Sequence, residues 1–308
     1  MNFLRFFPVD SWTFGAEHEY GDWDTRLGLP EGFYNDRREA KCMNSNGIAS
    51  SPAYLYGGEV NTPATKSPEG QGQAVANFLA MHPNATVNYR SCMHGHVLIP
   101  GLLQNLPALK QLNRYQRRYG PQILATIEPY RACWPSARDY PDPEELKGAV
   151  YRWKHRLVSH QTILDRATVD GMSRASTVRD FFLFAKPRGG WQFFRRPAVN
   201  LHRMFPETSK DHTTPTIEFR HFPGSLDPEV VAEAARWCRD YLILALSDAD
   251  PSEKLAQYKK RGLLPMPFPR YDHALELRFK QTCAKDGRTV AQLRSAIHAV
   301  FGDLAPGR

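Results

Sequence analysis

The chain has 308 residues, of which 42% are hydrophobic and 23% charged, and its formal net charge is +8. This composition excludes a disordered chain and supplies enough apolar residues for one large domain or two smaller ones. The positive charge fits an anionic partner, such as a nucleotide, a nucleic acid or an acidic metabolite, without choosing among them.

The cysteines and the N-terminal residues predict a cytoplasmic protein. Five cysteines are scattered along the chain without a Cys-x-x-Cys pair, which argues against a disulfide framework and against a cysteine zinc site. The apolar run from Phe3 to Phe7 is short, contains Arg5 and is broken by Pro8, so we expect no signal peptide. Because no apolar stretch approaches the roughly 20 residues that a membrane-spanning helix needs, we expect no membrane partner.

The first hundred residues are predicted to form three strands and a helix. Residues 12–20 and 54–61 read as strands, and residues 21–52, rich in Gly, Asn, Asp and Ser, read as a long loop between them. Ser67-Pro68-Glu69 predicts a helix start, because serine caps a helix, proline fits its first turn and glutamate favours its positive end. Residues 87–99 are predicted to form a strand that ends at Pro100.

Helices are predicted to make up most of the second part. The proline-rich, basic segment 250–270 is expected to be a surface connection, and about 38 residues after it are expected to be helical. The remaining predictions are helices over 102–118, from Asp142-Pro143-Glu144 to about 164 and from Asp227-Pro228-Glu229 to about 245, and strands over 181–185, 191–194 and 216–222.

This element order predicts one α+β domain. No shift in composition marks a domain boundary, and the strands are separated by helices and long loops, which favours a mainly antiparallel sheet. We therefore expect a single domain over 1–308, with a core at about 12–246 and a C-terminal helical extension at about 250–308.

Three residue pairs on predicted strands share the same spacing of two. They are Glu17 and Glu19, His94 and His96, and Glu218 and Arg220. Side chains two apart on a strand point the same way, so the pairs share a face if their strands share a sheet. Carboxylates and imidazoles bind divalent metals, and arginine suits phosphate, so the pairs together predict metal-assisted chemistry on a nucleotide.

Each pair alone also has an ordinary structural explanation. Glu17 and Glu19 could be the acids of an exposed strand face, and Glu218 and Arg220 a same-face ion pair. His18 and His221 should point to the opposite face, where we expect them to be packing residues.

Two further stretches are weak signals by themselves. Glu59 follows two glycines and precedes Asn61, as in a backbone that a ligand approaches. Arg195, Arg196 and Arg203, with Asn200, form a basic stretch whose default interpretation is a solvated surface. In a nucleotide site these side chains would donate hydrogen bonds to phosphate.

Taken in order, the segments resemble a known family. The motifs are Gly-x-Glu-x-Glu at 15–19, Gly-Glu-x-Asn-x-Pro at 58–63, Met-His-x-His at 93–96 and Thr-x-Glu-Phe-Arg at 216–220. Together, over about residues 12–246, they resemble the amidoligase family within the glutamine synthetase and glutamate–cysteine ligase superfamily of carboxylate–amine ligases. The resemblance implies a glutamine-synthetase-like fold, with helices packed on one side of a curved, mainly antiparallel sheet.

The resemblance also implies roles for the motif residues. The Glu-x-Glu pair would hold two catalytic metals, Mg²⁺ or Mn²⁺, and His94 would ligate one of them. His96 would lie beside the substrate and the transferred phosphate, and Arg220 would bind phosphate; these two are the expected catalytic residues. The implied metal ligands are Glu17, Glu19, Glu59, His94 and Glu218, and the implied ATP-binding residues are Arg195, Arg196, Arg203 and Arg220.

The activity implied is ATP-dependent formation of an amide through an acyl phosphate. The substrates would be a small-molecule or peptide carboxylate and an amine, whose identities the sequence does not give. Related ligases range from monomers to large rings, so an oligomer is compatible with the sequence.

Three other functions stay open at this stage. Phosphoryl transfer without ligation occurs on this type of fold in the guanidino kinases, and a zinc hydrolase could use Glu17, His94, His96 and Glu218 without ATP. A basic nucleic-acid-binding protein would use the runs 114–118 and 259–261, in the first of which tyrosine interleaves with arginine, although no binding motif accompanies them.

Overall fold

A six-stranded antiparallel sheet forms the centre of the fold. The computed structural model describes residues 2–24, 27–36, 56–83, 85, 92–131, 166–184, 199–204, 215–223 and 225–261. The strand order across the sheet is β2-β3-β1-β4-β6-β5. The strands are β1 (Thr13–Asp24), β2 (Tyr34–Asp36), β3 (Tyr56–Asn61), β4 (Cys92–Leu98), β5 (Val199–Asn200) and β6 (Ile217–Pro223).

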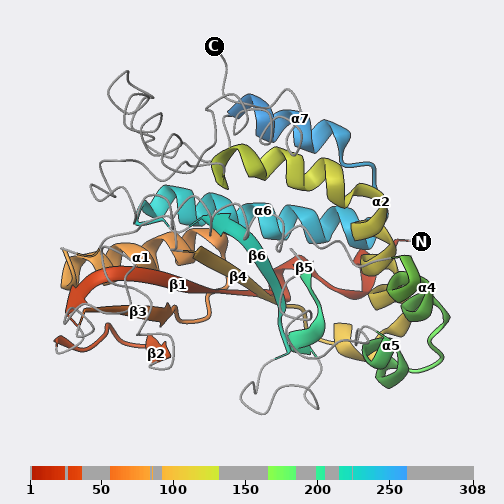
Figure 1. Cartoon of the computed structure of the whole chain (residues 1–308), viewed down its shortest axis with the longest axis horizontal. Coiled ribbons are helices and arrows are strands. Elements are labelled where there is room, and N and C mark those ends of the chain that lie inside the picture. The colour runs from red at the N-terminus through yellow and green to blue at the C-terminus, as the bar shows by residue number, and fades with distance from the viewer. Residues whose placement is uncertain are drawn as a thin grey trace, which may run out of the picture.

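Helices cover one face of this sheet, which confirms the α+β class. Figure 1 shows α1 and α6 lying along the strands, with α2 and α7 stacked beyond α6 and with α4 and α5 at one end. Among the described residues, none of these helices is both long and apolar enough to span a bilayer. The helices are α1 (Pro68–Met81), α2 (Leu106–Arg131), α4 (Arg166–Arg174), α5 (Val178–Phe184), α6 (Pro228–Ser247) and α7 (Ser252–Arg261), with short 3₁₀ turns at Leu4–Phe6, Val9–Ser11, Leu102–Gln104 and His202–Met204.

Aromatic side chains join the sheet to the helices. Trp237 of α6 packs edge-on against Phe219 and Phe222 of β6, with ring centroids 6.0 and 5.7 Å apart. Tyr20 of β1 stacks on Phe78 of α1 at 4.9 Å. All five side chains are buried. Burying each contributes about 1.5–3 kcal/mol or more, so these contacts fix which face of the sheet meets the helices.

The predicted helix starts at Ser67 and Asp227 are confirmed. The Ser67 side chain accepts a hydrogen bond from the backbone of Gly70, and Asp227 accepts one from the backbone of Glu229, each satisfying a donor that the helix leaves open. At the other end of α6, Asp248 adopts a left-handed backbone with φ of 59°, which ends the helix.

Two of the predicted segments were wrong in type. Residues 181–185, predicted as a strand, lie mostly in α5, which Thr177 caps by accepting from the backbone of Asp180. The segment 250–270, predicted as a surface connection, contains α7, and its side chains Lys254 and Tyr258 both bond Asp240 of α6, at 2.8 and 2.7 Å. An aromatic run favours a strand by propensity, but the contacts that buried Phe181 and Phe182 make decide for a helix.

The other boundaries shift modestly. β1 continues to Asp24 rather than ending at Gly21, and the loop predicted over 21–52 contains β2. The strands predicted near 54–61, 87–99 and 216–222 and the helix predicted over 102–118 are present with adjusted ends. The helix from 142 to about 164, the strand over 191–194 and the helical pieces beyond 261 lie outside the described residues.

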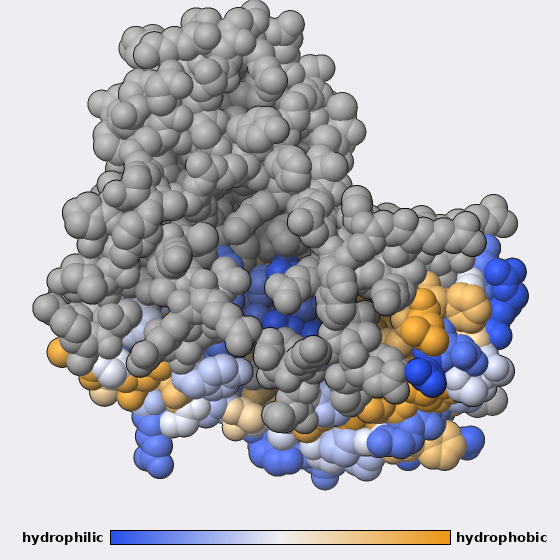
Figure 2. All heavy atoms as spheres, turned by 60° about the horizontal axis from the view of Figure 1, so that its bottom comes forward, coloured by the Kyte–Doolittle hydropathy of each residue, from blue (hydrophilic) through white to orange (hydrophobic). Residues whose placement is uncertain are grey.

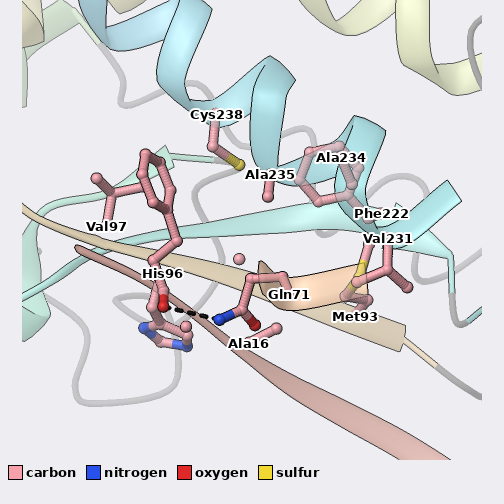
Figure 3. Close-up of a pocket in the computed structure, with 13 residues that line it drawn as sticks. Ala16, Gln71, Met93, His96, Val97, Phe222, Val231, Ala234, Ala235 and Cys238 are labelled. Carbon is pink, nitrogen blue, oxygen red and sulfur yellow. Dashed lines mark hydrogen bonds between the residues drawn. The ribbon is translucent and has the colours of Figure 1, made fainter. Parts of the chain in front are cut away.

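Gly95 sets how closely α6 approaches the sheet. A Cβ atom at this position would lie 3.0 Å from the Sγ atom of Cys238 on α6, which is closer than such atoms normally pack. Figure 3 shows Cys238 pointing from α6 towards β4. The glycine between the two histidines therefore lets the strand that carries them lie directly under the helix.

We expect Gly95→Ala to destabilise the fold by about 1–3 kcal/mol, because the added methyl group overpacks the contact with Cys238. Urea unfolding followed by circular dichroism measures this loss. Gly15→Ala on the neighbouring strand is the matched control, since its Cβ atom would meet nothing closer than 3.9 Å. Adding Cys238→Ala to Gly95→Ala should restore part of the stability. Equal stability of Gly95→Ala and Gly15→Ala would show that the contact with Cys238 is not tight.

Candidate metal centre

The strand register brings the predicted acids and imidazoles to one face of the sheet. In the β1–β4 ladder, Glu17 is directly opposite His94. In the β4–β6 ladder, His96 is directly opposite Glu218. Directly opposite residues in an antiparallel pair share a face. The two histidines of β4 therefore lie between two carboxylates, Glu17 of β1 on one side and Glu218 of β6 on the other.

The same face extends to the outer strands. Glu19 is opposite Glu59 of β3, and Asn61 of β3 is opposite Glu17. On the other side, Asn200 of β5 is opposite Glu218. Glu19 and Glu59 thus belong to the same polar face, one step along the strands from the centre formed by Glu17 and His94.

A bulge in β6 determines which of its side chains lie on the polar face of the sheet and which lie under the helices. Gly95 is opposite Phe219 and Met93 is opposite Phe222, so two residues of β6 stand against His94 alone. Such a bulge turns the following side chain to the other face. Phe222 consequently packs under the helices, while Arg220 stays on the polar face and bonds Glu218.

The two faces of the sheet are chemically different. In Figure 3 the imidazole ring of His96 lies on the far side of the strands from Cys238 and the other α6 side chains. Figure 2 looks towards the face away from the helices, and hydrophilic residues gather at its centre. His18 points to the helix side, as predicted: it is fully buried, stacks on Tyr20 at 5.1 Å, and burial, with the neighbouring His94, lowers its pKa to about 3.

Glu17 contacts both histidines and an arginine. Its Oε2 atom is 3.0 Å from Nδ1 of His94, and its Oε1 atom is 3.3 Å from Nε2 of His96. Oε1 also accepts a hydrogen bond from the guanidinium of Arg203, which follows β5 in the turn His202–Met204. Glu17 is only 5% exposed, so these groups replace the water that an ionised carboxylate requires.

Glu218 is completely buried and has its own set of partners. Asn200 donates to its Oε2 atom at 2.7 Å, and Arg220 donates to its Oε1 atom. The Nε atom of Arg203 lies 3.5 Å from Oε2, and His94 Nδ1 lies 3.7 Å from Oε1. Arg203 therefore bridges the carboxylates of Glu17 and Glu218.

These contacts keep both acids ionised despite their burial. Burial alone raises the pKa of Glu17, but attraction to His96, the hydrogen bond with His94 and the charge of Arg203 hold it well below its usual value. Burial likewise opposes ionisation of Glu218, but Arg220 and Arg203 lower its pKa to about 2. Burial works to lower the pKa of Arg203, whereas the two carboxylates raise it.

Glu17, His96 and Glu218 are close enough to share one cation. Each offers one ligand atom, and the three atoms lie within 4.8 Å of one another. Two carboxylates and an imidazole are ligands that Mn²⁺ and Zn²⁺ accept. The donor set therefore fits a divalent metal, and the burial of all three residues keeps their ligand atoms away from competing water.

Residues behind the sheet hold β1 in position beside Glu17. Gln71 of α1 donates from its side-chain nitrogen to the carbonyl of Phe14 at 2.8 Å, the bond drawn dashed in Figure 3, and accepts from Thr62 at 2.6 Å. Thr62 in turn accepts from the backbone of Ala16 at 2.8 Å. Because these bonds are buried, they fix the backbone that immediately precedes Glu17.

The structure brings together most of the predicted site residues. Glu17, His94, His96 and Glu218 meet, and Arg220 and Arg203 bond the acids among them. Glu19 and Glu59 lie on the same face outside the three-ligand group, while Arg195 and Arg196 lie outside the described residues.

Two participants were missed by the sequence analysis. Thr216 lies 3.1 Å from Nδ1 of His96 through its hydroxyl, and it is two residues before Glu218, so the same spacing rule would have found it. Gln71 lies on a helix far from the motifs in sequence, and nothing in its own segment signals its role.

Comparison with known proteins gives no match to any family model, curated protein or solved structure.

Glu218 should make stability depend on pH in metal-free protein. Its pKa falls from 4.5 to about 2 on folding, so its charge stabilises the fold above about pH 4.5, and this contribution is lost as pH falls towards 2. We expect the free energy of urea unfolding, measured with a chelator between about pH 6 and pH 3, to fall more steeply in wild type than in Glu218→Gln. Glu229→Gln, an exposed change on α6, should follow wild type; parallel curves for all three proteins would contradict the assignment.

Proposed function

We propose that this protein is an ATP-dependent carboxylate–amine ligase. The observation that carries the proposal is the convergence, on one face of an antiparallel sheet, of two buried carboxylates, a His-x-His pair and two arginines. The motifs that supply these residues stand in the order found in the amidoligase family. ATP-dependent ligation requires groups that hold the negatively charged phosphates and the substrate carboxylate at one place.

The proposed reaction forms an amide in two steps. An oxygen of the substrate carboxylate attacks the γ-phosphorus of ATP, the bond to the ADP oxygen breaks, and an acyl phosphate forms. The amine nitrogen then attacks the acyl carbon, phosphate leaves, and the amine loses a proton. Phosphorylation is needed because a free carboxylate has no leaving group better than oxide.

The arginines supply positive charge to this chemistry. Arg220 and Arg203 lie at the two acids, and their guanidinium groups match the paired oxygens of a phosphoryl group. Fixed positive charge in a buried site stabilises the charge that develops during phosphoryl transfer more than water does.

The histidines would divide the remaining tasks. His94 bonds Glu17 and so orients that carboxylate, while His96 lies between Glu17 and Thr216.

Bound Mg²⁺ or Mn²⁺ would neutralise phosphate charge and polarise the γ-phosphoryl group. Glu17, Glu218 and one imidazole would hold such an ion, and Glu19 and Glu59 provide further carboxylates on the same face.

One observation weighs against the nucleic-acid alternative. Tyr115, the aromatic residue in the basic run 114–118, is buried and packs edge-on against Tyr241 at 5.8 Å. A base cannot stack on a ring that is already enclosed, and the run therefore lacks the exposed aromatic that single-stranded binding uses.

The test is product analysis with ATP, Mg²⁺ or Mn²⁺ and a panel of candidate acids and amines. We expect ADP and phosphate in equal amounts with an amide, and a rate at least about 10²-fold lower in Arg220→Gln, because a charge-stabilising donor is lost. Glu17→Gln should be similarly impaired. Glu253→Gln, an exposed change on α7, is the control and should retain the wild-type rate.

Two outcomes would overturn the proposal in favour of the alternatives. A stable phosphorylated product without an amide would indicate a phosphotransferase. Hydrolysis that needs metal but no ATP would indicate a hydrolase that uses the same ligands.

A further inference from the structure

Tyr34 is an exposed aromatic residue at the edge of the polar face. It begins β2, the edge strand, and lies directly opposite Asn61 of β3, which is itself directly opposite Glu17 of β1. Directly opposite residues share a face, so the three side chains form one row across the sheet. Glu17 and Asn61 are each 5% exposed, whereas Tyr34 is 62% exposed. The row therefore leads from a buried acid to an open aromatic ring.

Phe33 shows which way Tyr34 points. The Phe33 ring stacks on Phe78 of α1, with centroids 6.3 Å apart, so Phe33 faces the helices. Successive side chains of an extended chain alternate between the two faces of a sheet. Tyr34 therefore faces away from the helices and lies on the same side as Glu17. Figure 1 shows β2 beside β3, at the edge of the sheet.

The chain that leads into Tyr34 is held against its surroundings. The carbonyl of Gly28 accepts a hydrogen bond from Nε2 of His82, the residue that ends α1, at 3.0 Å. Gly32 has a left-handed backbone with φ of 80°, and a Cβ atom there would lie 3.1 Å from Pro63. An aromatic side chain on such an anchored backbone loses little conformational freedom when a ligand covers it.

The exposed ring and the arginines are suited to the two ends of one ligand. Tyr34 and Glu17 belong to strands separated by β3 alone, so two strand spacings, about 10 Å, lie between them. Arg203 contacts Glu17, and Arg220 contacts Glu218 beyond it. Guanidinium groups bind phosphate and carboxylate, and an aromatic face stacks on a flat conjugated ring. A molecule with an anionic end and a planar ring therefore matches this row.

We propose that Tyr34 is a stacking platform for a planar ring of the bound ligand, whose anionic end lies at Arg203 and Arg220. The anionic end rests on the proposed function, whereas the ring is a new requirement. It has two possible sources, which share the same chemistry: the base of a nucleotide and an aromatic group on the acid substrate.

The experiment is calorimetric titration of the full-length chain with two pairs of probes. ATP is compared with ribose triphosphate, which lacks the base, in the presence of Mg²⁺, and benzoate is compared with acetate, which lacks the ring. Tyr34→Ala should weaken binding of a ring-bearing probe by about fivefold or more and leave its ring-free counterpart within about twofold. Tyr34→Phe should bind like wild type, because the ring face and not the hydroxyl makes the contact.

Phe6→Ala is the matched control. Phe6 is another exposed aromatic residue, 53% exposed, but it lies in the turn Leu4–Phe6 with the guanidinium of Arg5 over its ring at 4.7 Å. Its removal should leave the affinity for all four probes unchanged. Because Tyr34 is largely exposed, Tyr34→Ala should keep the wild-type fold, which circular dichroism checks.

The two pairs of probes identify the source of the ring. Weaker binding of ATP alone in Tyr34→Ala assigns the platform to the nucleotide base. Weaker binding of benzoate alone assigns it to an aromatic acid substrate.

The platform is overturned if Tyr34→Ala binds all four probes as wild type does, or if wild type binds none of them. Equal weakening of the ring-bearing and ring-free probes would also overturn it, because Tyr34 would then support the edge of the site without stacking. Binding is measured without turnover, so the two proposals fail separately. A ring-dependent loss in a chain that forms no amide removes the ligase alone, and full ligase activity with unchanged affinities in Tyr34→Ala removes the platform alone.

Discussion

The arrangement depends on the requirement that two buried carboxylates be matched by positive charge. Glu17 and Glu218 are 5% and 0% exposed, and they belong to strands separated by β4 alone. Leaving such a charge unpaired costs about 3–5 kcal/mol. Arg203 and Arg220 supply the match, and a cation would supply it equally well. The same requirement therefore explains why these ion pairs form and why the group could hold a cation.

The two faces of the sheet have different roles: one packs against the helices, and the other carries the candidate site. One face carries aromatic side chains that pack under α1 and α6, and the other carries the acids, imidazoles and arginines. Gly95 allows the first face to approach α6 at the point where His94 and His96 occupy the second. The bulge in β6 also separates the two faces: Arg220 lies on the polar face and contacts Glu218, whereas Phe222, two residues later, lies in the core.

The sequence was sufficient for the elements whose signals are local. Alternating spacing identified the strands of Glu17, His94 and Glu218, and the pairing of a capping residue with proline and glutamate identified the starts of α1 and α6. Asp250-Pro251-Ser252-Glu253 resembles those start signals, yet the proline-rich basic composition that follows it hid α7. Phe181 and Phe182 led to the wrong prediction of a strand over 181–185. The strand propensity of a short apolar run is weak, and tertiary contacts decide its structure.

What could not be predicted is the partner of each side chain. Spacing places His94 and His96 on one face, but it does not tell that His94 contacts Glu17 and Glu218 while His96 contacts Glu17 and Thr216. Those contacts depend on Thr216, which directly precedes β6, and on the register between β4 and β6. Arg203 and Gln71 are further cases, since their contacts with Glu17 and with the backbone beside it join segments far apart in the chain.

We expect these segments to form one site for a cation and phosphate. The most direct measurement is diffraction from crystals grown with Mn²⁺ and a non-hydrolysable ATP analogue, using the anomalous signal of manganese. We expect a manganese peak in contact with Glu17, His96 and Glu218, with the phosphates of the analogue beside it and near Arg203 and Arg220. Manganese and nucleotide bound elsewhere, or not at all, would contradict a shared site.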